Sequence, residues 1–132
     1  MSICAHPKVK LDGVPYEVDS GISGLIQRIT DHGIQTFDSC EDKFNGGRIF
    51  IYFNSAGELQ SFLDILFSSR NGESDPLLNR VISKIDDGPE DWQYITGVHP
   101  VFTKPGGEPT GVAVTVSVEF PASDYNELLR RL

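Results

Sequence analysis

Apolar residues recur along the chain at the three- and four-residue spacing that is typical of amphipathic helices. Ile22, Leu25, Ile26 and Ile29 form one such stripe, and Gly33 is placed to end the helix. A capping box at Ser55 and an Asp-Pro step at Asp75 predict two further helix starts. The stripes that follow these signals predict helices from Leu59 to Phe67, from Leu77 to Ile85, and, after a cap at Ser123, from Tyr125 to Leu132.

Other segments have the patterns of strands. Val112, Val114, Val116, Val118 and Phe120 alternate with small or polar residues, which predicts a strand that buries one face in the core. The remaining predicted strands are a hairpin around Asp12-Gly13, a strand from Ile34 to Asp38, a strand from Arg48 to Phe53 that is apolar on both faces, and a bent or edge strand from Trp92 to Phe102. A polar loop is expected from Ser39 to Gly47.

Helices interspersed with antiparallel strand pairs predict an α+β fold, in which helices cover one face of a mainly antiparallel sheet. The chain has 132 residues, the size of one ordinary domain, and no linker or repeat divides it. We therefore expect a single α+β domain over residues 1–132. A ferredoxin-like plait with additions is the topology that best fits the element order.

The chain carries 19 acidic and 11 basic side chains, for a net charge of −8. This balance argues against direct nucleic-acid binding, which needs clustered lysine and arginine. No apolar run is long enough to cross a membrane, so we expect a cytoplasmic protein. The two cysteines predict no disulfide framework. Cys4, His6, Cys40 and His99 are zinc-ligand types, but their spacing is poor, so we predict neither a metal site nor a cofactor.

Two short elements stand out against this background. One is Asp19-Ser20-Gly21-Ile22 before the first helix, and the other is Gly33-Ile34-Gln35-Thr36-Phe37-Asp38-Ser39-Cys40-Glu41-Asp42. Together with Val118-Glu119-Phe120-Pro121 they resemble a family of small uncharacterised proteins of bacteriophages and actinobacteria, over residues 9–69 and 112–132. The resemblance implies a phage or prophage setting and carries no catalytic residues.

The loop after the predicted strand offers a candidate ligand-binding site, made of Ser39, Cys40, Glu41, Asp42 and Arg48. Arg48 would favour a reactive thiolate at Cys40, whereas the neighbouring carboxylates would oppose it. A small buried side chain at Cys40 and turn-forming serine and aspartate residues explain the same sequence. We assign no catalytic residue, and we expect a binding protein rather than an enzyme.

Acidic residues concentrate between Asn71 and Asp91, and they include Asp86, Asp87, Glu90 and Asp91 beside Trp92. A solvated helix and its loops would explain them. The sharper hypothesis is a partner-binding surface that engages a host protein with a basic surface, such as a nucleic-acid-binding defence factor, with Trp92 as its anchor. The alternatives are a small nucleotide- or ligand-binding protein or minor enzyme using the Ser39 to Arg48 loop, and a homodimer formed through an edge strand.

Overall fold

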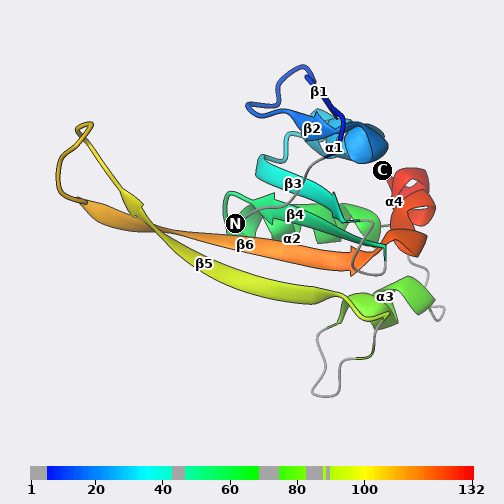
Figure 1. The fold of residues 1–132 in the computed structure, drawn as a ribbon. Coiled ribbons are helices and arrows are strands. Elements are labelled where there is room, and N and C mark those ends of the chain that lie inside the picture. The colour runs from blue at the N-terminus through cyan, green and yellow to red at the C-terminus, as the bar shows by residue number, and fades with distance from the viewer. Residues whose placement is uncertain (1–5, 43–46, 69–74, 83–87, 89) are drawn as a thin grey trace.

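The computed structural model describes residues 6–42, 47–68, 75–82, 88 and 90–132. A four-stranded sheet forms the centre of the molecule (Figure 1). Its strands are β3 (Thr36–Asp42), β4 (Arg48–Phe53), β5 (Gln93–Val101) and β6 (Gly111–Pro121), in the order β3-β4-β6-β5. The short strands β1 (Lys8–Val9) and β2 (Val18–Asp19) pair as a separate ribbon.

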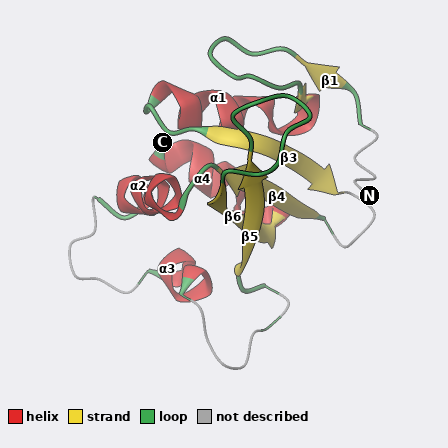
Figure 2. Cartoon of the chain, turned by 90° about the vertical axis from the view of Figure 1, so that its left-hand side faces the viewer, coloured by secondary structure: helices red, strands yellow, loops and turns green. Residues whose placement is uncertain are grey.

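In the described part of the chain, four α-helices and two short 3-10 turns accompany the sheet, and the helices gather to one side of it (Figure 2). They are η1 (Ser20–Ile22), α1 (Ser23–Asp31), α2 (Ala56–Leu66), α3 (Pro76–Val81), η2 (Ala122–Asp124) and α4 (Tyr125–Arg131). The predicted α+β class is confirmed. Strands β4 and β5 are parallel, are joined through α2 and α3, and flank β6, which is the split βαβ arrangement of a ferredoxin-like plait. The element order differs from the βαββαβ order of that plait, because two hairpins, β3–β4 and β5–β6, lie on either side of α2 and α3 in the chain.

Three helix signals act as predicted, whereas the cap expected at Ser123 is wrong, because Ser123 lies inside η2 and Asp124 precedes α4. The Ser55 hydroxyl accepts a hydrogen bond from the backbone N–H of Glu58 at 3.3 Å, and the Asp75 carboxylate accepts one from Leu77 at 3.1 Å. Gly33 adopts a φ of 80° just after α1, a left-handed conformation that glycine tolerates best. Helix α3 ends at Val81; the predicted continuation through Ile85 reaches residues outside the described part of the chain.

Strand β3 corrects one prediction. It continues to Asp42, so Ser39, Cys40 and Glu41 lie within a strand and not in a polar loop. These three residues pair with β4, whose bounds match the prediction, and the ladder of backbone hydrogen bonds outweighs their polar character.

The core lies between the sheet and the helices. Four aromatic rings form a continuous row there: Phe53 and Phe62 have ring centres 5.4 Å apart, Phe62 and Trp92 6.5 Å, and Trp92 and Phe120 4.5 Å. The Trp92 indole N–H donates to the Asp124 carboxylate at 2.9 Å, so this row ends in a buried polar contact. The arrangement fixes β5 and β6 against α2 and the C-terminal segment.

Candidate functional site

The most prominent surface feature is the outer half of the β5–β6 hairpin, which projects from the body as a two-stranded arm (Figure 1). We define the arm as residues 97–114. Strand β4 pairs with β6 only as far as Val116, whereas β5 and β6 stay paired out to Val101 and Gly111. At ~3.3 Å per residue, the five residues from Gly97 to Val101 carry the arm about 16 Å beyond the sheet.

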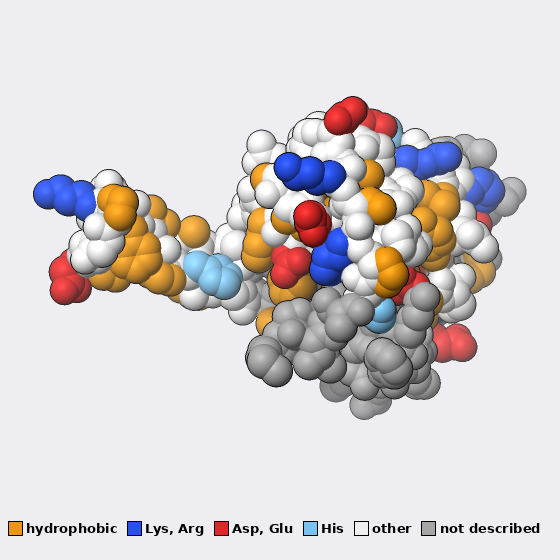
Figure 3. All heavy atoms as spheres, turned by 45° about the horizontal axis from the view of Figure 1, so that its top comes forward, with side chains coloured by type: hydrophobic (Ala, Val, Ile, Leu, Met, Phe, Trp, Pro, Cys, Tyr) orange, Lys and Arg blue, Asp and Glu red, His pale blue; other side chains and the backbone are white. Residues whose placement is uncertain are grey.

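One face of the arm continues the core face of the sheet. Val98 pairs with Val114, and Pro100 pairs with Val112, on the side that buries Val118 nearer the body. Val98, Val112 and Val114 are 64%, 69% and 49% exposed. The prediction that Val112 and Val114 face the core is therefore wrong, because the helices end before the strand does. Apolar side chains line the arm (Figure 3).

The arm also differs from the body in charge. Its charged residues are Lys104 and Glu108, which cancel, so the net charge of −8 belongs to the remainder of the chain. Pro100 lies on the edge strand and has no backbone N–H to donate to a further strand. A partner is therefore better accommodated on the apolar face of the arm than along its edge.

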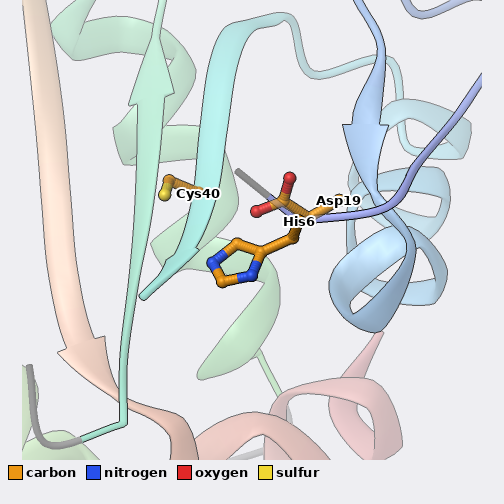
Figure 4. Close-up of side chains that lie close together, drawn as sticks. All are labelled: His6, Asp19 and Cys40. Carbon is orange, nitrogen blue, oxygen red and sulfur yellow. The ribbon is translucent and has the colours of Figure 1, made fainter. Parts of the chain in front are cut away.

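A second candidate site is formed by residues from the N-terminal third of the chain. His6, Asp19 and Cys40 each offer a ligand-type atom, and these atoms lie within 4.8 Å of one another. Figure 4 shows that they come from three separate segments: the N-terminal segment, the end of β2 and the middle of β3. Asp19 is fully buried, whereas His6 and Cys40 are partly exposed. We call these three residues the N-terminal cluster.

Contacts of Asp19 hold the cluster together. One carboxylate oxygen accepts a hydrogen bond from Lys8 Nζ at 2.5 Å, and the other accepts one from the backbone N–H of Glu41 at 2.8 Å. A further bond, from the N–H of Ser20 to the carbonyl of Pro7 at 2.8 Å, fixes the N-terminal segment on the ribbon. The β1–β2 ribbon is thereby anchored to β3.

Two short sequence elements, residues 19–22 and residues 33–42, meet at this place. Asp19 and Gly21 come from the first element, and Cys40 and Glu41 come from the second. Gly21 lies so close to Glu41 that a Cβ atom at position 21 would be 1.9 Å from the Glu41 carboxylate. A side chain at this position would have to displace Glu41.

Cys40 is disulfide-bonded, which corrects the expectation that the chain contains no disulfide. The sequence contains one other cysteine, Cys4, which lies outside the described residues. His99, the fourth residue considered as a zinc ligand, is not part of the cluster. It lies on the arm, where its ring nitrogen Nε2 is 2.8 Å from the Thr115 hydroxyl.

The other residues of the predicted ligand loop are engaged within the fold. Ser39 is buried, and its hydroxyl accepts a long hydrogen bond of 3.5 Å from Tyr16. Burial raises the pKa of the Tyr16 phenol, while its hydrogen bonds to Ser39 and Thr36 act in the opposite direction. Arg48 forms an ion pair with Glu119 at 2.5 Å. The side chain of Asp42 lies outside the described part.

The structure describes three of the five predicted partner-binding residues, and one of these three is buried. Glu90 is exposed, and the Asp91 carboxylate accepts a hydrogen bond from the N–H of Gly88 at 2.9 Å. Trp92 is 1% exposed and packs in the core, so it is not available as a surface anchor. Asp86 and Asp87 lie outside the described residues.

Sequence reasoning missed the arm and most of the N-terminal cluster. The interruption of the edge strand by Gly97 and Pro100, next to a longer alternating strand, was the available signal for a hairpin that leaves the sheet. For the cluster, the signal was the pair of elements that contain Asp19 and Cys40.

Comparisons with protein-family models, with curated proteins and with solved structures found no match to this chain. Among the described residues, no helix has the length and apolar character needed to span a membrane. The function is therefore argued from the arm and the cluster.

Proposed function

We propose that this chain is a non-catalytic interaction protein that places the apolar face of its arm against a partner protein. The observation that supports this is the continuation of the core face of the sheet beyond the helices that cover it. Large exposed apolar patches on otherwise polar proteins mark interaction sites, and an uncovered strand face of this kind favours association.

The chemistry of the partner follows from charge. A neutral apolar arm on a body of net charge −8 fits a partner that has an apolar groove beside a basic surface. The acidic body would accelerate the encounter through long-range attraction, and the arm would supply short-range affinity. A host protein with a basic surface, such as a nucleic-acid-binding defence factor, is the partner class that the acidic charge and a phage or prophage setting favour.

The expected contribution of the arm can be bounded. Burying the exposed parts of Val98, Val112 and Val114 would contribute about 1 kcal/mol each, because each side chain is already partly covered. Their sum of about 3 kcal/mol corresponds to roughly a hundredfold in affinity. The arm can therefore decide whether a complex of moderate strength forms.

The test compares two variants of the full chain in affinity purification from host cells, followed by mass spectrometry. V98S/V112S/V114S removes the apolar face of the arm. Ile95→Ser is the matched control, because Ile95 is 61% exposed on the same strand but points to the opposite face. The proposal predicts a basic protein that is retained by wild type and the control, is lost from the triple variant, and dissociates as salt concentration rises.

Equal recovery by wild type and the triple variant would contradict the proposal. Sizing of the purified protein at high concentration separates a second copy of this chain from a different partner. If the wild-type protein self-associates and the triple variant does not, the arm is assigned to a homodimer and the basic-partner proposal is overturned.

A further inference from the structure

The N-terminal cluster combines three different metal-ligating groups, and the function proposed for the arm does not involve them. We propose that His6, Asp19 and Cys40 bind one zinc ion when the Cys40 disulfide is reduced. The mixture of an imidazole nitrogen, a carboxylate oxygen and a thiolate sulfur is one that zinc accepts readily, and the thiolate disfavours calcium and magnesium.

The distances between the donor atoms are close to those of a bound site. Ligands around a tetrahedral zinc ion lie about 3.4–3.8 Å apart, given bonds of about 2.0–2.3 Å. The three donors are already within 4.8 Å of one another. Rotation of partly exposed side chains at His6 and Cys40 can close the remaining difference without moving the buried Asp19.

The contacts of Asp19 hold its carboxylate in place beside the other two residues. One oxygen accepts a hydrogen bond from Lys8 and the other accepts one from the N–H of Glu41. Groups that hydrogen-bond to a ligating carboxylate orient it and raise the affinity for the metal. Lys8 also offsets the negative charge that the thiolate and carboxylate bring together.

Zinc binding and the disulfide are mutually exclusive at Cys40. A thiol or phosphine reductant supplies two electrons, and two protons complete the two thiols that replace the S–S bond. Each thiol that then ligates zinc loses its proton to solvent, so binding releases protons and strengthens as pH rises. The three residues leave a fourth position of a tetrahedral site for water.

A metal at this place would join three segments. Hydrogen bonds of Asp19 link the ribbon to β3, and a zinc ion would add bonds from one residue each of the N-terminal segment, the ribbon and β3. Zinc would therefore stabilise the ribbon on the sheet in reducing conditions, in which the disulfide is absent.

The test uses cobalt(II), which replaces zinc in tetrahedral sites and is coloured there. The full chain is reduced with a phosphine, freed of excess reductant without oxygen, and titrated with cobalt. We expect one equivalent to give thiolate-to-cobalt absorption, and we expect zinc to abolish it. His6→Gln should weaken binding at least tenfold, and Cys40→Ser should remove the absorption. His99→Gln is the matched control, because it changes a histidine on the arm.

Several results would overturn the proposal: no thiolate-to-cobalt absorption in the reduced wild type, or equal affinities of His6→Gln and His99→Gln. Circular dichroism of each variant without metal shows that a loss of binding is not a loss of fold. X-ray absorption of the zinc form gives the sulfur count. One sulfur neighbour, from Cys40, supports the site, and none excludes it.

Discussion

Replacing Asp124 with alanine should destabilise the protein strongly, because this carboxylate serves two partners at once. It accepts the indole N–H of Trp92 at 2.9 Å and an N–H of Arg80 at 2.7 Å. Asp124 is 4% exposed and Trp92 1% exposed, so water does not replace the lost bond at the indole. The effect is not a loss of helix capping, since the Asp124 side chain makes no cap hydrogen bond to α4.

The expected loss of free energy of unfolding follows from the groups that lose their hydrogen-bond partner. A buried N–H left without an acceptor costs about 2 kcal/mol. The side chain of Arg80 is 27% exposed, so solvent partly replaces its ion pair, and we count about 1 kcal/mol for it. The total of about 3 kcal/mol is a large part of the stability of a domain of this size, and should lower the melting temperature by roughly 10 °C.

The assay is urea unfolding followed by tryptophan fluorescence, which reports on one site because Trp92 is the only tryptophan. Asp64→Ala is the control, because Asp64 is exposed and accepts a hydrogen bond from Gln60; it should change the free energy of unfolding by about 0.5 kcal/mol or less. A loss below about 1 kcal/mol for Asp124→Ala would refute the reasoning that this contact is a buried anchor.

Three further predictions concern other parts of the chain. Hydrogen bonds from Arg131 hold the pKa of Asp75 below its ordinary value, so the contact stabilises the fold at pH values above the Asp75 pKa of the unfolded chain. This stabilisation is lost as the pH falls through the lower pKa of the folded state. Arg131→Ala should therefore flatten the dependence of the free energy of unfolding on acid pH in urea titrations, and an unchanged profile would contradict this. Ser55→Ala should reduce stability by about 1 kcal/mol in the same assay, because it removes the cap of α2, and no loss would argue against the cap. Val112→Ser and Val114→Ser should leave the melting temperature nearly unchanged, whereas a large drop would mean that the arm belongs to the core.

Local sequence signals predict where helices and strands begin and end more reliably than they predict what covers these elements in the fold. Strand β4 has the predicted bounds because its side chains are apolar on both faces. The starts of α2 and α3 follow from Ser55 and Asp75, whose side chains need only a neighbouring backbone N–H. In contrast, the alternation of β6 predicts which residues share a face and does not predict how far the helices extend over it.

The N-terminal cluster illustrates the same limit at the level of a site. The spacing of Cys4, His6, Cys40 and His99 along the chain gives no reason to group Asp19 with them. In the structure, pairing of Lys8 with Asp19 brings the N-terminal segment alongside β2, and the bond from Glu41 to Asp19 brings β3 to the same place. A buried carboxylate that links two strands in this way places the histidine and cysteine side chains near each other. Ligand spacing is therefore informative only when the ligands share a turn or a hairpin, and a site assembled across a sheet has to be sought in the strand register.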